Sequence, residues 1–425
     1  MIRRAIAASL VALGLLNAAQ PVSAASACSY GSMTTQYELG TFYGRVVDAT
    51  TGKELFAKRA KEQTPSASVL KVITGIGALL ELPGGFTVDT TVSTVVGSPE
   101  TLVLRGAGDP TLSRLMPPHY TTYPRPARLG RLAEATLAAL PQGTKITNII
   151  VDETYFDGRA YNPYWKASDR TNGYISPITA LQVDGARVNP DLTDKKYSGY
   201  RVSDPVQQAG VVFRNYLGAV ARGAKISEQH FNYRATTQIA AVTSSTVETW
   251  VDHAMKHSDN TEVEFIARQV SKYLGFGTNF TSIQPSAMKT LRDLGVDSTG
   301  LVMHDAAGLA QDDRVTAKLI TDALLATTDP ASPAVNFANY LATTTSAGTL
   351  STRFKGANKL PDNAVQAKTG FIPGLYSLAG FVTARDGHRL VFAFFARGGR
   401  VGYGTRNALD SLVVKAYRCG AKLTR

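Results

Sequence analysis

The sequence predicts an α/β (α+β) fold in which helices flank an antiparallel sheet and a large, mostly β insertion interrupts the chain. Apolar runs around turn residues indicate β-hairpins near both ends, over residues 41–58 and 377–397. Apolar residues at helical spacing mark helices over 247–254 and 263–274. Residues 88–238 are instead rich in turn residues and short strand patterns, which favours a separate unit.

We therefore expect a catalytic domain formed by residues 28–87 plus 239–425, with residues 88–238 as inserted accessory domain or domains. The strands near the two ends can share one sheet, with a final helix over 404–417 beside it.

Residues 1–27 read as a signal peptide. Arg3 and Arg4 precede an apolar run over residues 5–16, and the small residues over 25–27 suit cleavage. A membrane anchor is the alternative, but the run is too short to span a bilayer. The sequence thus predicts an exported protein, periplasmic or otherwise extracytoplasmic.

The only two cysteines are Cys28 and Cys419. An even count in an oxidising compartment favours a disulfide between them. Cys28 directly follows the expected cleavage site, so a lipid anchor is the alternative, although Ala25 stands where such sites usually carry Leu or Val.

The formal charge is +12, and it falls to +10 when Arg3 and Arg4 are removed. A basic exported protein suits an anionic envelope surface as a partner. Nucleic acid is disfavoured, because the basic residues are scattered and do not alternate with aromatic residues. A solvated basic surface without a dedicated partner is the third interpretation and the simplest one.

The first chemical motif is Ser68-Val-Leu-Lys71. Residues 69–80 form an apolar helical stretch in which Lys71 is the only charge, so we expect a buried helix. Burial disfavours the ammonium form and makes a neutral amine base accessible near neutral pH. Ser68 lies one turn earlier on the same face, where that base can activate its hydroxyl.

The same spacing recurs at Ser286-Ala-Met-Lys289, in a helix that carries more charge. We interpret this second pair as an ordinary surface helix pair. Its presence means that Ser-x-x-Lys alone is weak evidence for a catalytic site.

Ser258-Asp-Asn260 falls between two predicted helices, where it could be only a turn. Together with the first motif it gains a role: Ser258 can pass a proton to a leaving amine, and Asn260 can hold the substrate amide and Lys71. Two nearby histidines, His253 and His257, lack the glutamate of a zinc-protease helix and are expected to be solvated.

The third motif, Lys368-Thr369-Gly370, lies on a predicted strand over 365–372. Lys368 and Thr369 can bind a substrate carboxylate, and Gly370 lets another backbone approach. The alternative is an edge-strand lysine that only prevents aggregation.

In this order, the three motifs resemble those of the low-molecular-mass class C penicillin-binding proteins, the D-alanyl-D-alanine carboxypeptidase/endopeptidase family. Segments 106–112, 151–158 and 174–181 look like the family's insertion, and 304–309 is similar to a later family segment. Phe371 departs from the family, which usually has a carboxylate-binding Thr or Ser there, and the insertion looks shorter than usual.

The resemblance implies a penicillin-recognising serine transpeptidase-like domain, with an oxyanion hole formed by the backbone N–H groups of Ser68 and Phe371. It implies a serine DD-peptidase that cleaves peptidoglycan stem peptides or cross-links through an acyl-enzyme on Ser68. β-Lactams would act as inhibitors by acylating the same serine. No metal or other cofactor is required, and the oligomeric state is not predicted.

Two other functions stay open. A β-lactamase would need a second base, and no motif places a glutamate for that task. A non-catalytic wall-binding relative would tolerate Phe371 and a short insertion, but the complete set of three motifs argues against it.

Overall fold

The computed structural model describes residues 28–190, 199–228, 235–398 and 401–424. The predicted signal peptide over 1–27 lies outside the described residues. In the part that is described, no helix combines the length and the apolar character that crossing a membrane requires.

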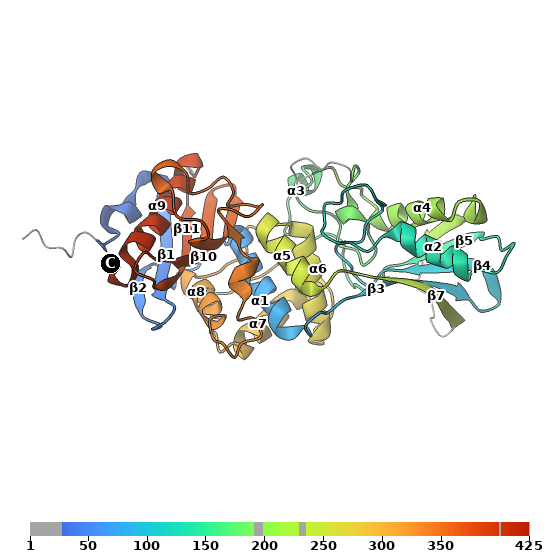
Figure 1. The fold of residues 1–425 in the computed structure, drawn as a ribbon, viewed down its shortest axis with the longest axis horizontal. Helices are drawn as coiled ribbons and strands as arrows, with labels where there is room; N and C mark the ends of the chain where they lie inside the picture. Colours follow the sequence, from blue (N-terminus) through green and yellow to red (C-terminus); the bar gives the residue numbers. More distant parts are fainter. Residues whose placement is uncertain (1–27, 191–198, 229–234, 399–400, 425) are drawn as a thin grey trace, which may run out of the picture.

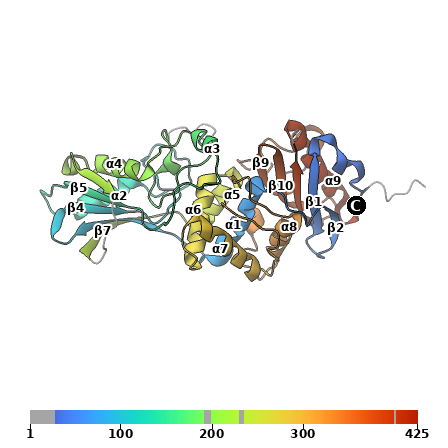
Figure 2. The ribbon, with the colours of Figure 1, turned by 180° about the vertical axis from the view of Figure 1, so that it is seen from behind.

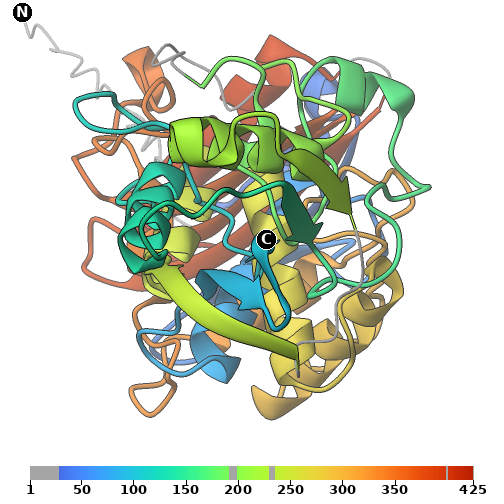
Figure 3. The ribbon, with the colours of Figure 1, turned by 90° about the vertical axis from the view of Figure 1, so that its right-hand side faces the viewer.

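The molecule is elongated, with a sheet at each end and a group of helices between them (Figures 1 and 2). Figure 3 looks from the end that carries the second sheet, so the teal and green segments lie in front of the orange and red ones. The three catalytic motifs belong to the first sheet and the central helices.

The first sheet has six strands in the order β2-β1-β11-β10-β9-β8, and every neighbouring pair is antiparallel. The strands are β1 (Thr41–Asp48), β2 (Glu54–Lys58), β8 (Ala342–Thr343), β9 (Val365–Ile372), β10 (Leu375–Thr383) and β11 (Arg389–Arg397). β1 pairs with β11 along its whole length, so the prediction that both chain ends share one sheet is confirmed.

Both faces of this sheet are buried. Side chains alternate between the two faces along each strand, and each face packs against its own apolar core. On β11, Phe392 and Phe394 pack with the C-terminal helix α9 (Tyr403–Cys419). Val391 and Phe395 point the other way and join the core formed with the central helices. Cys28 and Cys419 form a disulfide, with Cα atoms 5.4 Å apart, that ties the N-terminal segment to α9.

The central helices surround α1, and the first eight residues of α1, Lys71 to Ala78, are all buried. Their bounds are α1 (Lys71–Glu81), α5 (Val247–His257), α6 (Asn260–Tyr273), α7 (Phe280–Asp293) and α8 (Ala317–Ala326). The expectation of a buried helix with one ammonium is confirmed, because the Lys71 side chain has no exposed surface.

The second sheet is formed mostly by the expected insertion over 88–238, although its last strand continues beyond residue 238. It has the order β6-β5-β4-β3-β7, with β4, β5 and β6 parallel. Its strands are β3 (Asp89–Val95), β4 (Ser98–Arg105), β5 (Asn148–Asp152), β6 (Lys225–Glu228) and β7 (Thr236–Thr243). Helices α2 (Leu129–Ala139) and α4 (Pro205–Leu217) share a core with it, so this unit carries more helix than expected.

A short helix, α3 (Ala167–Thr171), lies on the side of this unit nearest the central helices. We propose that residues 88–238 form the inserted domain, with the rest of β7 as the return connection. The separate apolar core of this sheet supports that division.

Candidate active site

Ser68 lies on a 3-10 turn (η4, Ala67–Leu70) directly before α1. The preceding Ala67 has a φ of 46°, an unfavourable left-handed conformation for a residue with a side chain. Gly308 packs against this bend, and a Cβ on it would meet the Ala67 carbonyl oxygen at 2.1 Å. The bend therefore depends on a glycine in a distant segment, and such strained backbone tends to occur at functional sites.

The Lys71 amine is surrounded by oxygen atoms. Its Nζ lies 2.9 Å from the Ser68 Oγ, 2.7 Å from the Asn260 Oδ1 and 2.5 Å from the Ala307 carbonyl oxygen. In its neutral form the amine can donate to the amide and carbonyl oxygens, which cannot themselves donate a proton. Its lone pair then faces the Ser68 hydroxyl.

Burial lowers the pKa of Lys71 from 10.5 to about 8, although buried carboxyl groups, led by Asp305 and Glu264, partly offset the effect. A neutral amine is therefore available near neutral pH. This is the protonation state that a base for the Ser68 hydroxyl must have.

The Ala307 carbonyl is held in place by a buried acid. The backbone N–H groups of Ala306 and Ala307 both donate to Glu264 Oε1, each at 2.8 Å. Asp305 accepts from the Gly308 amide at 2.6 Å and from the Trp165 indole at 2.7 Å. The sequence offered only a family resemblance for this segment, because no side-chain pattern reveals a backbone carbonyl as a ligand of the lysine.

The second motif lies at the junction of α5 and α6. Ser258 follows α5 in the left-handed conformation, with φ 61°. Asp259 caps α6 by accepting from the Glu262 amide at 2.9 Å. Asn260 begins α6 and donates through Nδ2 to the Tyr174 carbonyl at 2.9 Å.

The insertion also holds this motif in place. Arg187 Nη2 lies 3.4 Å from Asp259 Oδ2, and both side chains are buried. Burial would raise the pKa of Asp259, but the arginines Arg187 and Arg201 and the neighbouring His253 bring it below its ordinary value. Asp259 therefore stays ionised and paired, which fixes the turn that presents Ser258.

The third motif lies along β9. Lys368 Nζ donates to the Ser258 Oγ at 2.8 Å. The pKa of Lys368 lies well below its ordinary value, mainly because the side chain is buried and also because Lys71 is near. A Cβ on Gly370 would meet the Ser377 Oγ at 2.2 Å and the Ser68 backbone nitrogen at 3.0 Å. The glycine thus lets β9 lie beside the amide of the nucleophile, as expected.

Phe371 follows the glycine, and its side chain is 56% exposed. Its ring lies 4.6 Å from the ring of Tyr376 on the adjacent strand β10. The ring thus stands at the rim of the site, while the backbone of β9 continues beside Ser68.

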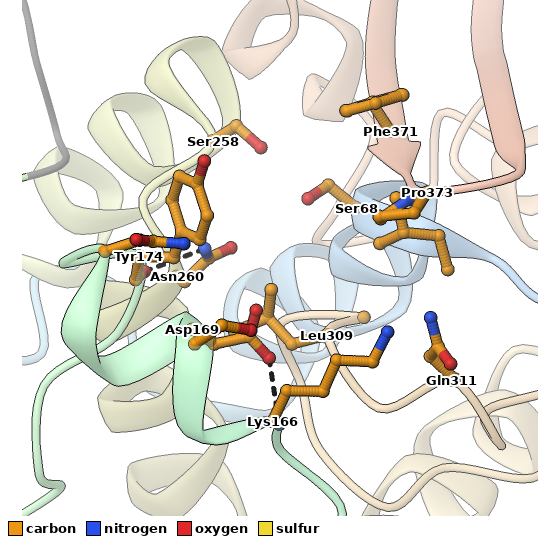
Figure 4. A pocket seen from close by; sticks show the side chains of 14 residues that line it. Ser68, Lys166, Asp169, Tyr174, Ser258, Asn260, Leu309, Gln311, Phe371 and Pro373 are labelled. Atoms are coloured by element: carbon orange, nitrogen blue, oxygen red, sulfur yellow. Dashed lines mark hydrogen bonds between the residues drawn. The ribbon is translucent and has the colours of Figure 1, made fainter.

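These groups open into one cleft (Figure 4). Ser68, Ser258 and Phe371 face each other across its upper part, and Asn260 and Tyr174 lie on one side. Polar residues of the insertion and of the 304–311 segment line the cleft as well, namely Lys166, Ser168, Asp169, Asn172 and Gln311. Asp169 accepts from the Lys166 backbone at 3.0 Å and so fixes this edge.

The histidine expectation is wrong for one residue. His253 is buried, with its Nδ1 2.6 Å from Glu262 Oε2 and its ring 5.3 Å from that of Tyr123. Tyr123 belongs to the insertion, which covers this face of α5, and a helical pattern alone cannot reveal such a cover. Across the described ranges, no group of three or more His, Cys, Asp or Glu side chains is arranged to hold a metal ion.

Comparisons with known proteins agree with this geometry. The model of the D-Ala-D-Ala carboxypeptidase 3 (S13) family matches residues 29–224 and 194–416. Carboxypeptidase DacB of Mycolicibacterium smegmatis is 32% identical over 411 residues, covering 96% of this chain and 87% of that protein. The D-alanyl-D-alanine carboxypeptidase of an Actinomadura species is 24% identical over 430 residues, covering 83% and 77%.

Among solved structures, penicillin-binding protein 4 of Haemophilus influenzae superposes with a TM-score of 0.77 at 18% identity, covering 91% of this chain and 99% of that one. A predatory endopeptidase of Bdellovibrio bacteriovorus gives a TM-score of 0.53 at 15% identity, covering 88% and 91%. At these identities, the structural matches support the fold.

Proposed function

Since the chain belongs to the D-Ala-D-Ala carboxypeptidase 3 (S13) family, we propose that it is a serine DD-peptidase acting on peptidoglycan through an acyl-enzyme on Ser68. This family assignment confirms the resemblance to class C penicillin-binding proteins. The observation that carries the mechanism is the contact of a buried amine, Lys71 Nζ, with the Ser68 hydroxyl at 2.9 Å.

In the first step, Lys71 removes the proton of the Ser68 hydroxyl, and the Oγ attacks the carbonyl carbon that joins two D-amino acids. The new C–O bond turns the carbonyl oxygen into an oxyanion. The amides of Ser68 and Phe371 are the proposed donors to it. The closeness of Gly370 to the Ser68 nitrogen supports this assignment.

In the second step, the C–N bond breaks and the leaving amine needs a proton. Ser258 is the proposed relay, which passes the proton taken up by Lys71 to this amine. It lies across the cleft from Ser68, and Lys368 holds its Oγ by a hydrogen bond of 2.8 Å. Water then attacks the acyl-enzyme and releases the shortened peptide with a new carboxyl group. Lys368 and Thr369 are the proposed partners of the substrate carboxylate, and Asn260 of the substrate amide.

A β-lactam carries a similar amide, so its ring opens on the same attack and leaves Ser68 acylated. We propose that penicillins inhibit the enzyme in this way. A structure of penicillin-binding protein 4 of H. influenzae with a β-lactam supports this proposal.

We also propose that the protein is exported and acts at the cell wall. The Cys28–Cys419 disulfide supports this location, because such bonds persist mainly in oxidising compartments. The peptidase family to which the chain belongs supports it as well. An anionic envelope surface remains a proposed partner of the basic chain.

The test is labelling with a fluorescent penicillin, combined with D-alanine release from an N-acylated peptide ending in D-Ala-D-Ala and with cleavage of a cross-linked muropeptide. A long-lived adduct on Ser68 together with peptide cleavage is expected. Rapid loss of the adduct with turnover of penicillin would indicate a β-lactamase instead. Absence of any adduct would indicate a non-catalytic relative.

A further inference from the structure

A second opening lies beside the active-site cleft and shares Ser68, Ser258 and Phe371 with it, and Thr369 and Gly370 of the third motif line it as well. Three of its other lining residues belong to none of the three motifs: Thr349, Arg353 and Arg406. The opening is lined by no Asp or Glu side chain of the described chain, so it is a polar site with positive charge.

Arg353 is held rigidly at this opening. Its Nε donates to both carboxylate oxygens of Asp410, at 2.9 and 3.1 Å, and its Nη2 donates to Asp410 Oδ1 at 2.5 Å. Each side chain is only 3% exposed. Within the described residues its Nη1 has no hydrogen-bond partner, so one edge of a preorganised guanidinium remains for a ligand.

Thr349 adds a hydroxyl without a partner. Its backbone nitrogen donates to the Lys256 carbonyl at 3.0 Å, but its Oγ1 is buried and bonds to no atom of the described structure. A buried hydroxyl without a partner costs free energy, about 1–3 kcal/mol in general, and calls for an explanation. A ligand that accepts a hydrogen bond in this opening would satisfy it.

Arg406 supplies the net charge. The Asp410 carboxylate neutralises Arg353, whereas the Arg406 side chain is only half-buried and donates through Nη2 to the neutral hydroxyl of Thr352 at 2.7 Å. The Arg406 carbonyl in turn accepts from Arg353 Nη2 at 3.4 Å. This contact joins the Arg353 guanidinium to the Arg406 backbone, and both arginines line the same opening.

We propose that Arg353, Arg406 and Thr349 bind the C-terminal carboxylate of the substrate residue that leaves, in addition to Lys368 and Thr369 of the third motif. The inference rests on the proposed peptidase function and names the determinant of its substrate class, which is peptides with a free carboxylate next to the scissile bond. The placement follows from the shared residues. Ser258, the proposed proton donor to the leaving amine, lines both openings, but Thr369 of the third motif lines only this one, whereas Asn260 and Tyr174 line only the other cleft.

The site also accounts for Phe371. A phenyl ring cannot hydrogen-bond to a carboxylate, and Phe371 lines the same opening. The arginines and the Thr349 hydroxyl provide the donors that this position lacks, so recognition of a free carboxylate does not require a hydroxyl at residue 371.

The experiment compares two substrates of the full exported chain: an N-acylated D-Ala-D-Ala tripeptide with a free carboxylate, and the same peptide as its C-terminal amide. The measured quantity is the ratio of the two kcat/KM values. Arg406→Gln is expected to lower this ratio about tenfold, since a charge-assisted hydrogen bond is lost. Thr349→Val removes only a hydroxyl and is expected to lower it about threefold.

The matched control is Arg418→Gln, an exposed arginine in the last turn of the same helix as Arg406, which should leave the ratio unchanged. Thermal unfolding of Thr349→Val should match the parent protein, because no contact within the described structure is lost. A fall in both kcat/KM values with an unchanged ratio would show a merely structural role and overturn the inference.

The two proposals fail differently. If the parent protein neither binds penicillin covalently nor cleaves either peptide, the peptidase function is wrong. If it does both, and the ratio is the same in Arg406→Gln, Thr349→Val and the parent, the peptidase stands and the carboxylate site is wrong.

Discussion

Ser68 and Lys71 can be compared with Ser286 and Lys289, which have the same spacing in the chain. In the first pair, the amine and the hydroxyl are 2.9 Å apart and the amine is buried among neutral oxygens. In the second pair, the Ser286 hydroxyl donates to the Ile283 carbonyl at 2.9 Å, and Lys289 pairs with a carboxylate of its own helix. The spacing is the same, but only one pair is in contact.

The difference comes from the backbone and from burial. Ser286 lies inside α7, where a serine hydroxyl can bond back to its own helix. Ser68 lies on the turn before α1, and the left-handed Ala67 precedes it. Only Ser68 has strand β9 beside its amide. Ser68 therefore differs from Ser286 in its bent backbone, its buried amine partner and its neighbouring strand. A separate substitution can test each of these features.

The largest expected effect follows from removal of the nucleophile. Ser68→Ala should abolish penicillin labelling and lower kcat/KM on a D-Ala-D-Ala peptide by about a thousandfold or more, because no other group can form the acyl bond. The matched Ser286→Ala should change neither by more than about twofold, since the Ser286 hydroxyl is buried and bonds only to its own helix, away from Ser68. Labelling gels, intact mass and circular dichroism measure both.

Labelling that survives Ser68→Ala but disappears in Ser286→Ala would reverse the comparison. Loss of both activities in Ser286→Ala with an unfolded spectrum would instead mean that the buried Ser286 has a packing role.

Gly370→Ala tests the neighbouring strand. The new Cβ would meet the Ser377 Oγ at 2.2 Å and the Ser68 nitrogen at 3.0 Å, so either the Ser377 hydroxyl must leave its partner, the Ser66 carbonyl, or β9 must move away from the nucleophile. A displacement of about 1 Å at a reacting centre can cost about a hundredfold, and we expect a loss of that size in the rate of acylation. Stopped-flow acylation by a chromogenic penicillin measures it.

The control is Gly84→Ala, because a Cβ there meets no atom within 4 Å. It should acylate at the parent rate. An equal rate in Gly370→Ala would mean that β9 does not shape the site.

The buried amine predicts a pH dependence. Burial lowers the pKa of Lys71 to about 8, and acylation needs the neutral form. Below pH 8 the rate should therefore rise about tenfold per pH unit, and it should level off above pH 8. If Lys289 were the base instead, the rate would still be rising above pH 10.5, because the bond with Asp293 raises the pKa of this partly exposed lysine above that ordinary value.

The rate of penicillin acylation from pH 6 to pH 10, with thermal unfolding at each pH, decides between these profiles. A flat profile in a protein that stays folded would show that Lys71 is not the base.

The sequence predicted which motif side chains lie together, because the order of three motifs constrains them jointly. The contacts of Lys71 with Ser68 and Asn260, and of Lys368 with Ser258, join residues from all three. Whether each performs its expected role stays a prediction for the experiments above. The first sheet was also predictable, since its hairpins have clear alternation and turn residues.

Other features could not be predicted, for physical reasons. The contact of the Ala307 carbonyl with Lys71 has no side-chain signal in the sequence. Arg353 and Thr349 lie beside the motif residues only in the folded chain, so their place at the site could not be predicted. The helix α4, in contrast, has a readable start: Asp204 caps it and Pro205 occupies its first turn. The prediction of a mostly β insertion did not take this helix start into account.

The smallest expected effect concerns Phe371, which follows Gly370 on strand β9. Phe371 is 56% exposed, and its ring partner in the described structure is Tyr376, so the ring can be removed without opening the core. Phe371→Thr adds one hydroxyl donor beside the proposed carboxylate site. If Arg406 already binds the carboxylate, the gain in kcat/KM on a D-Ala-D-Ala tripeptide should be about threefold, a fraction of what a full hydrogen bond can give.

The same substitution should have a larger effect where the arginine is absent, because two donors that serve one carboxylate are not independent. In the Arg406→Gln background, Phe371→Thr should recover about tenfold on the tripeptide, since about 1.4 kcal/mol corresponds to that factor. Steady-state kinetics on the tripeptide and on a cross-linked muropeptide measure the gain and the substrate preference. An equal gain in both backgrounds would mean that residue 371 and Arg406 contact different parts of the substrate. A preference that stays unchanged would mean that the phenyl ring has no part in carboxylate recognition.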